Sequence, residues 1–206
     1  MSSVEEDFNQ RCEEIEKYLG HLLVLEKESG VDVALMATMK ASAMLLIYNL
    51  VESTAVNCIE SIYDHLKVES IGFIAVDDSL KAMVLKCARD SNPKKLVEKM
   101  RSELLDLAVA AFKKDAVFSG NVDARSIREM WSDYGISRTG AYEEEALLQV
   151  KTARNDLAHG VKSFSELGRS LTAPDLEVKY RATKEFLFVA LKDVERHIAN
   201  EIRVAA

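Results

Sequence analysis

Arg154 and His159 are the strongest candidates for a catalytic pair in this sequence. An arginine presents a permanently charged, planar fork of N–H donors that suits the oxygens of a phosphate group. A histidine titrates near neutral pH and can serve as a base or as an acid. Metal-independent cleavage of RNA needs these functions. Protons must leave the attacking 2′-hydroxyl and reach the departing 5′-oxygen while positive charge stabilises the phosphorane.

Polar neighbours of this pair are candidates for supporting roles. Asn155 follows the arginine directly, and it could orient the site, bond across an interface or act as a plain helix cap. Asp156 could hold the histidine, although an ordinary surface charge is the simpler interpretation. Lys151 and Lys162 flank the segment and would give a local basic rim, although neighbouring surface lysines are common. We predict that Asn155 is catalytic with the arginine and histidine, and that Lys151, Asp156 and Lys162 bind substrate.

Other polar residues are open to two interpretations. Asn49, Glu52 and Ser53 interrupt the most apolar segment, so they either line a cleft or form the solvated stripe of a helix. Arg125 and Arg169 either bind RNA phosphates or tie loops to the helices through ion pairs, and the second role is the simpler one for both. The sequence leaves open whether Asn49, Glu52, Arg125 and Arg169 line the site.

The elements that must position these residues are predicted to be helices. Glycine (8 residues) and proline (2 residues) are scarce, and strong helix formers are abundant. Apolar residues recur at three- and four-residue steps, the spacing of one helical face, along several segments. The predicted core helices span residues 4–28, 33–66, 124–134, 142–157 and 172–202. Short connections favour antiparallel neighbours, so we predict an all-α bundle.

The helix over residues 142–157 carries the arginine, and Gly160 is well placed to end it with a left-handed cap. On an ideal helix, residues five apart lie roughly 140° apart around the axis and about 7.5 Å apart along it. Arg154 and His159 therefore do not share one face of a straight helix. We expect His159 in the last turn, where its side chain can swing toward a cleft.

Residues 68–117 are predicted to form a helical insertion, followed by a polar turn over residues 118–123. The insertion would lie between the second and third core helices. Length and composition otherwise indicate one domain, residues 1–206, without an internal repeat or a low-complexity tract.

Within this insertion, residues 68–76 are expected to be irregular. Asp78 can cap a short helix that ends near Arg89. Asn92, which is followed by a proline, is a typical start for a second helix. We expect that second helix to reach about residue 114.

The charge of the chain limits the classes of function. The formal net charge is −7, with 48% hydrophobic and 30% charged residues, as in an ordinary globular protein. An acidic chain lacks the global basic field that gathers nucleic acid, which counts strongly against a general nucleic-acid coat protein and mildly against a nuclease. Any RNA contact must therefore come from a local patch.

The cysteines and histidines give no sign of a metal site. Cys12, Cys58 and Cys87 lie far apart in helical patterns, which predicts reduced thiols in a reducing cytoplasm. No histidine has a second ligand at helical spacing, so we expect neither a metal nor a cofactor. The most apolar stretch, residues 41–51, is too short to span a bilayer, and the first residues lack a signal-peptide core. We therefore expect a cytoplasmic protein without a membrane partner.

Three segments together resemble a branch of standalone prokaryotic HEPN proteins. They are residues 48–54 (Tyr-Asn-Leu-Val-Glu-Ser-Thr), 118–125 (Phe-Ser-Gly-Asn-Val-Asp-Ala-Arg) and 154–160 (Arg-Asn-Asp-Leu-Ala-His-Gly). The last has the R-N-x3-H form of the HEPN ribonuclease motif and lies near the end of the penultimate long helix. The resemblance runs over most of the chain and is weakest over residues 67–117.

The resemblance implies a HEPN-type antiparallel four-helix bundle that forms a homodimer and brings two arginine–histidine motifs to a shared cleft. It also implies metal-independent RNA cleavage that leaves 2′,3′-cyclic phosphate ends. Such proteins often act as toxins or phage-defence effectors, with an antitoxin or a defence-system protein as partner. Two other functions stay open. One is a catalytically silent HEPN module that binds a nucleotide or a protein, and the other is a plain helical adaptor.

Overall fold

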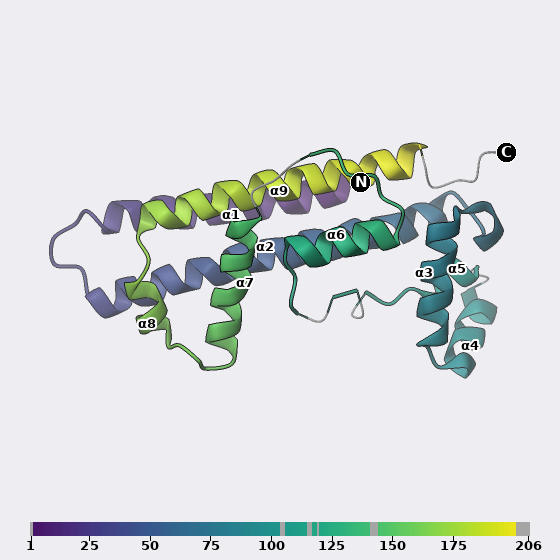
Figure 1. The fold of residues 1–206 in the computed structure, drawn as a ribbon, viewed down its shortest axis with the longest axis horizontal. Helices are drawn as coiled ribbons and strands as arrows, with labels where there is room; N and C mark the ends of the chain where they lie inside the picture. Colours follow the sequence, from purple (N-terminus) through teal and green to yellow (C-terminus); the bar gives the residue numbers. More distant parts are fainter. Residues whose placement is uncertain (1, 104–105, 115–116, 119, 141–143, 201–206) are drawn as a thin grey trace.

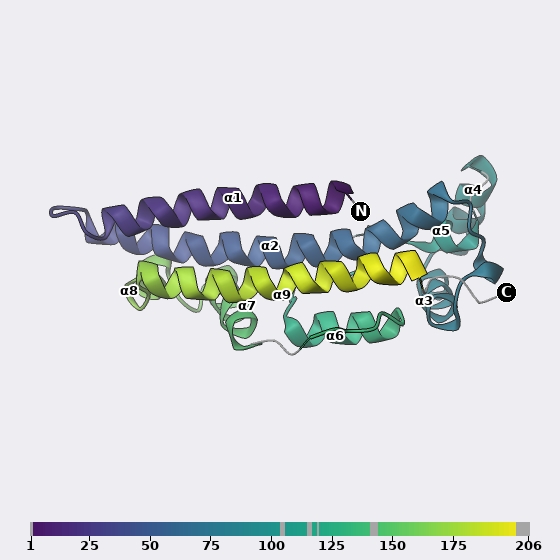
Figure 2. The ribbon, with the colours of Figure 1, turned by 90° about the horizontal axis from the view of Figure 1, so that it is seen from above.

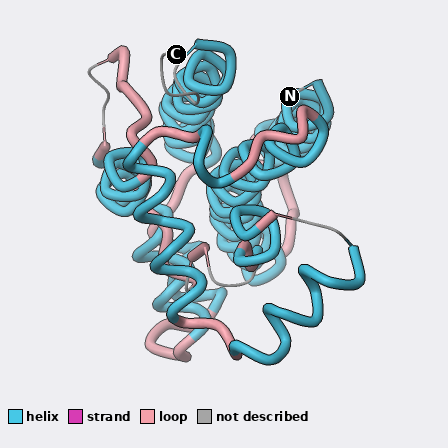
Figure 3. Tube along the Cα trace, turned by 90° about the vertical axis from the view of Figure 1, so that its right-hand side faces the viewer, coloured by secondary structure: helices cyan, strands magenta, loops and turns pink. Residues whose placement is uncertain are grey.

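The computed structural model describes residues 2–103, 106–114, 117–118, 120–140 and 144–200. Within these ranges the chain folds into helices joined by turns and loops, and no strand is present (Figure 3). The predicted all-α class is therefore confirmed. Long helices run along the molecule, and shorter ones are attached along one side and at one end (Figure 1).

Three long helices lie side by side (Figure 1, Figure 2). α1 spans Ser2–Leu25, α2 spans Val33–Val68 and α9 spans Ala173–Asn200. α1 and α2 are antiparallel and joined by a short loop, whose last residue, Asp32, caps α2 by accepting from two backbone amides. α9 contacts both of the others, and the apolar side chains that face one another form the core.

α2 is the central helix and the most apolar of the three long helices. By length and composition alone it could cross a membrane, since its most apolar 18-residue window has a mean hydropathy of 1.5. The core helix of a helical bundle has the same properties. α2 packs against α1, α7, α8 and α9. Because neighbours contact it from several sides, most of its surface must be apolar.

Two shorter helices pack directly on α2. α7 (Glu145–Ala158) runs at a steep angle to the long helices rather than alongside them (Figure 1). α8 (Phe164–Arg169) follows α7 and contacts the N-terminal part of α2. The α8 and α2 backbones approach each other closely at Gly168, where a Cβ atom would lie 1.7 Å from the carbonyl oxygen of Ala37. Only a glycine fits at this position.

The sequence prediction contains no helix at the place of α8. Six residues are too few for helical periodicity to be visible. A local signal does exist, because Ser163 accepts from the amide of Glu166 while the Glu166 carboxylate accepts from the amide of Ser163. This reciprocal capping box marks the start of a helix.

The predicted end of α6, the predicted end of α7 and the predicted start of α9 agree with the structure, whereas α1 ends at Leu25, three residues before its predicted end. α6 (Ala124–Asp133) stops before Gly135, whose φ is +72°. α7 is followed by Gly160 with φ +67°, as a left-handed cap requires. α9 opens directly after Thr172, at the predicted capping site. The predicted start of α7 near residue 142 lies outside the described residues.

The helices of the predicted insertion, residues 68–117, lie at one end of the molecule (Figure 1). Its elements are the 3₁₀ turn η1 (Phe73–Ala75) and the helices α3 (Asp78–Arg89), α4 (Pro93–Glu103) and α5 (Leu107–Ala111). The 3₁₀ turn lies within the segment predicted to be irregular. That these residues are an insertion into a HEPN core stays a prediction.

The second helix predicted in this region is wrong in its length. α4 starts directly after Asn92, as expected. The helix does not continue to residue 114, because the backbone of Asp106 is extended. The Asp106 carboxylate accepts from the amide of Ala108 over 3.0 Å, so it caps a new helix, α5. It also accepts from the amide of Phe73 over 2.8 Å and thereby ties η1 to α5.

The cap of α3 also differs by one residue from the prediction. Asp77 accepts from the amide of Leu80 over 3.0 Å, and Asp78 is the first helical residue. Either aspartate could cap the helix, and the sequence alone does not distinguish them.

Candidate active site

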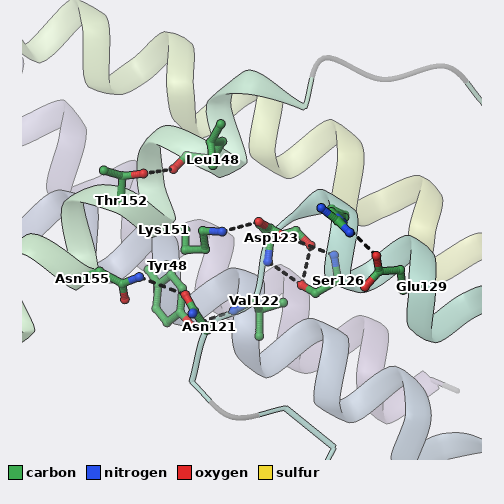
Figure 4. A network of polar contacts seen from close by, with 11 residues as sticks. Tyr48, Asn121, Val122, Asp123, Ser126, Glu129, Leu148, Lys151, Thr152 and Asn155 are labelled. Carbon is green, nitrogen blue, oxygen red and sulfur yellow. Dashed lines mark hydrogen bonds and ion pairs between the residues drawn. The ribbon is translucent and has the colours of Figure 1, made fainter.

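The three segments that carry the resemblance meet at one junction (Figure 4). Tyr48 lies on α2, its ring is buried, and its hydroxyl accepts a hydrogen bond of 3.1 Å from the backbone N–H of Val122. The guanidinium of Arg154, on α7, lies over the same ring, with 5.0 Å between Cζ and the ring centroid. Tyr48 therefore joins the loop before α6 to the helix that carries the motif.

Arg154 is half-buried and is confined on several sides. Its Nη1 atom donates to Oδ1 of Asn155 over 3.1 Å. On another side lies Gly120, where a Cβ atom would be 3.1 Å from Nη2 of Arg154 and 3.9 Å from Oε1 of Glu52. The φ of Gly120 is +72°, a region that favours glycine. This glycine therefore permits the turn of the loop and leaves the space that the guanidinium fills.

Two side-chain contacts tie the loop before α6 to α7 (Figure 4). Nδ2 of Asn155 donates to Oδ1 of Asn121 over 2.9 Å. Asp123 forms an ion pair with Lys151, and only 14% and 21% of these two side chains are exposed. Asp123 also accepts from the amide of Ser126 over 2.8 Å and so starts α6. The loop is thus held from both α2 and α7.

Two pKa shifts follow from this packing. Burial raises the pKa of the Tyr48 hydroxyl, despite the hydrogen bond from the loop amide. Burial acts in the same direction on Asp123, but the hydrogen bonds from Lys151 and Ser126 outweigh it, and the pKa of this carboxyl lies below its usual range. Both groups therefore keep one protonation state at neutral pH and act as supports rather than as acids or bases.

His159 has different surroundings. It is the C-cap of α7, and its backbone N–H bonds to the carbonyl of Asn155 over 3.0 Å. The side chain is exposed, and no described residue forms a hydrogen bond or an ion pair with it. The structure thus agrees with the expected position at the end of the helix. That the imidazole reaches a cleft shared with Arg154 stays a prediction.

The residues predicted to bind substrate all have partners within the chain. Nζ of Lys162 lies 2.7 Å from Oδ2 of Asp156, and Lys151 pairs with Asp123. Asp156 therefore contacts a lysine, as expected for a surface charge, and among the described residues no hydrogen bond or ion pair links its side chain to the histidine. Because a carboxylate neutralises each lysine, the predicted basic rim contains no unpaired cation at these two positions. Their roles in substrate binding stay predictions.

The polar residues of α2 divide between the two interpretations. Glu52 is half-buried and lies near Gly120, so it lines the junction. Ser53 donates to the carbonyl of Leu50 in its own helix, and Asn49 is exposed. These two residues thus belong to the polar stripe of the helix.

The two arginines left open by the sequence lie elsewhere. Nε of Arg125 is 2.8 Å from Oε1 of Glu129, one turn further along α6, which favours the ion-pair interpretation. Arg169 is exposed at the end of α8, near Ala37 and Gly168. Neither arginine contacts the motif residues in the part of the chain that the structure describes.

Four residues of the junction received no individual role from the sequence: Tyr48, Gly120, Asn121 and Asp123. Two features of the sequence could have pointed to them. They lie in the segments that resemble HEPN proteins, and two of them form the glycine–asparagine pair of a polar turn. Chemically, the junction presents a fixed guanidinium and two amide groups, which suit an anion. Among the described residues, no group of three or more histidine, cysteine, aspartate and glutamate side chains is arranged to hold a metal ion.

Comparison with known proteins identifies the family. The model of the MAE_28990-like HEPN family matches residues 1–199, which is nearly the whole chain. No curated protein and no solved structure matches the sequence. The match covers α1, α2, α7 and all but the last residue of α9, and it includes all three segments of the junction. The chain therefore belongs to the MAE_28990-like HEPN family.

Proposed function

We propose that this protein is a metal-independent endoribonuclease whose site is built around Arg154 and His159. The observation that carries the proposal is the confinement of Arg154 by Tyr48, Gly120 and Asn155, on a helix that ends in an exposed histidine. A guanidinium held in this way can stabilise the phosphorane oxygens without reorganising during the reaction. Membership in a HEPN family supports the same interpretation of the motif.

In the proposed reaction the 2′-hydroxyl attacks the adjacent phosphorus and the 5′-oxygen leaves. The products carry 2′,3′-cyclic phosphate and 5′-hydroxyl ends. One histidine takes the proton of the 2′-hydroxyl, and a second protonates the leaving oxygen. Asn155 orients the guanidinium through its side-chain oxygen. Because each chain supplies one His159, we propose a homodimer in which two motifs share a cleft.

The surface around His159 supports this assembly. Val161 and Phe164 are 69% and 38% exposed, and Ala158 is exposed as well. A two-fold interface at the end of α7 would cover these apolar side chains and hold both histidines. Light scattering at micromolar concentration should report a dimer. A strict monomer that still cleaves RNA would contradict the shared cleft.

The chemistry is tested by incubating the purified protein with total RNA in EDTA and mapping the new ends with kinase and phosphatase. We expect cyclic phosphate and 5′-hydroxyl ends. A substrate with 2′-deoxyribose at the scissile position should resist cleavage, because the attacking group is missing. Ends with 5′-phosphate, or a requirement for added magnesium, would mean that water and metal carry the reaction instead.

A second candidate function is a catalytically silent HEPN module that binds a nucleotide or a protein partner. It is favoured by the ion pairs of Lys151 and Lys162, which remove two cations from beside the motif, and by the net charge of −7. Binding of RNA or nucleotide without any cleavage, under the conditions above, would favour this module over the enzyme.

The biological setting that we propose is that of a toxin or phage-defence effector restrained by a partner protein. Expression of the wild-type chain alone should then arrest the growth of bacterial cells, whereas the His159→Ala variant should not. Equal growth of both cultures at equal protein level would contradict this setting.

A further inference from the structure

We infer that Asn121 contacts the substrate as a hydrogen-bond donor and recognises an acceptor oxygen of the RNA strand beside the phosphate bound by Arg154. The inference rests on the proposed function and adds to it a contact residue outside the R-N-x3-H motif. It follows from a chain of hydrogen bonds whose direction is fixed at one end.

Arg154 fixes this direction, because a guanidinium only donates hydrogen bonds. Its Nη1 atom lies 3.1 Å from the Asn155 side chain, so the oxygen of that amide must face it. Nδ2 of Asn155 then points toward Asn121, 2.9 Å away, and needs an acceptor there. Oδ1 of Asn121 takes this place, which turns Nδ2 of Asn121 away from α7. Both amide orientations therefore follow from the charge of the arginine.

The Nδ2 group of Asn121 is free to meet a ligand. Asn121 is exposed, and no described residue accepts a hydrogen bond from its Nδ2 atom. Its position is fixed, because the next residue, Val122, donates to Tyr48, and Asp123 pairs with Lys151 (Figure 4). A donor that is already held in place loses little conformational freedom on binding.

A donor at this position selects an acceptor. Asn121 and Arg154 are linked through a single side chain, so a strand whose phosphate meets the guanidinium brings a neighbouring group to Asn121. RNA offers two kinds of acceptor oxygen. Oxygens of the sugar–phosphate backbone, which are the phosphate oxygens and the 2′-hydroxyl, occur in every nucleotide, whereas base carbonyl oxygens occur in uracil, cytosine and guanine but not in adenine.

The test measures binding of oligo(U) and oligo(A) by fluorescence anisotropy, in His159→Ala protein so that cleavage does not interfere. Asn121→Ala removes the donor and should weaken binding about three- to tenfold, the effect of one hydrogen bond. Asn121→Asp keeps the acceptor that Asn155 needs but replaces the donor with a carboxylate. It should therefore weaken binding more than Asn121→Ala does.

The matched control is Asn92→Asp. It adds the same charge before α4, which lies at the far end of the molecule from α7, and aspartate keeps the helix cap. Binding should stay unchanged in this variant. A loss equal to that of Asn121→Asp would mean that net charge alone weakens binding, and would overturn the inference.

The remaining outcomes identify the ligand atom that Asn121 contacts, and they distinguish failure of this inference from failure of the proposed function. A preference for oligo(U) that Asn121→Ala abolishes would identify a base carbonyl, and an equal loss on both oligonucleotides would identify an oxygen of the sugar–phosphate backbone. Normal binding by Asn121→Asp would overturn the inference, because the residue would then only support Asn155. If the wild type still cleaves RNA, the proposed function stands and only this role fails. If the wild type neither binds nor cleaves RNA, the proposed function itself fails.

Discussion

Arg154 and His159 belong to one helix and one motif, yet the two side chains are held in different ways. Arg154 is half-buried against Tyr48, Gly120 and Asn155, and through them it is connected to α2 and to the loop before α6. His159 caps the exposed end of α7, and its side chain has no hydrogen-bond or ion-pair partner among the described residues. The junction end is organised within one chain, whereas the histidine end is not.

This difference corresponds to two chemical tasks. Stabilisation of charge gains most from groups that are fixed before the reaction begins. Proton transfer needs a group within hydrogen-bond reach of the substrate, and that geometry can tighten when the substrate or a partner is in place. We therefore expect one chain to build the anion-binding half of the site, and a second copy or the RNA to complete the proton-transfer half.

The largest expected effect is on catalysis at the exposed end. His159→Ala should lower the cleavage rate about 10²–10⁴-fold, because a proton-transfer group is lost. The melting temperature should change little, since the side chain is exposed and makes no described polar contact. Initial rates on labelled RNA and thermal unfolding measure the two effects. Full activity of the variant would remove the enzymatic interpretation.

Arg154→Lys breaks the junction end. A lysine keeps the positive charge but cannot lie over Tyr48 as a planar fork and donate to Asn155 at the same time. We expect the rate to fall about a hundredfold. Arg125→Lys is the control, because this exposed arginine pairs with Glu129 on its own helix, and the rate of the variant should stay at the wild-type level. An active Arg154→Lys variant would show that a point charge is sufficient.

Gly120→Ala tests whether the loop confines the guanidinium. Gly120 and Gly30 both have positive φ, +72° and +89°, so alanine at either position should cost about 1–2 kcal/mol of backbone strain. Only at Gly120 would the new Cβ lie 3.1 Å from Arg154, whereas nothing lies within 4 Å at Gly30. We expect similar losses in denaturant unfolding but a rate about tenfold lower only for Gly120→Ala. Equal rates would contradict the confinement.

Lys151→Met tests the ion pair of the junction through its effect on stability rather than on the cleavage rate. It leaves the largely buried Asp123 without its cation and should lower the free energy of unfolding by about 1–3 kcal/mol. The pKa of Asp123 is lowered in the folded protein, so its contribution is present above the ordinary aspartate pKa and is lost as the pH falls through the lower folded value. The difference between wild type and variant should therefore shrink below about pH 4. A difference that stays constant in acid would contradict the ion pair.

The smallest effect is expected for Lys162→Ala. The lysine is 49% exposed and its partner Asp156 is 20% exposed, so their ion pair should contribute less than about 1 kcal/mol to stability. Denaturant unfolding at low and high salt measures this contribution, and only the low-salt value should differ from the wild type. A large loss of unfolding free energy would mean that the contacts at the end of α7 contribute as much to stability as those of the junction.

The helices could be predicted from the sequence because their signals are local. Period and caps located α1, α2, α6 and α9, and Gly160 marked the end of α7. The errors arose where local signals were short or equivalent. Asp106 can lie inside a helix or cap a new one. Its hydrogen bond with the amide of Phe73, a residue 33 positions away, favours the capping conformation. α8 is too short for its period to be read.

The candidate site was only half visible in the sequence. Arg154 and His159 stand out through their types and spacing, because charge and titration are properties of single residues. Their partners do not stand out. Asn121 is 34 residues from Asn155, and Val122 is 74 residues from Tyr48, and no local pattern links residues at such distances.

Lys151 shows most clearly that the sequence alone does not determine which charges are paired. In the linear chain it is a cation beside an arginine–histidine motif, and an RNA contact is the natural expectation. In the folded protein the loop before α6 places Asp123 against it. The same carboxylate also accepts from the amide of Ser126 and so starts α6, and its ion pair with Lys151 helps to hold the loop beside Arg154. Residue types and helical period specify the all-α class and the reactive pair. Which charges are paired and which stay free depends on contacts that form only when α2, α6 and α7 pack together.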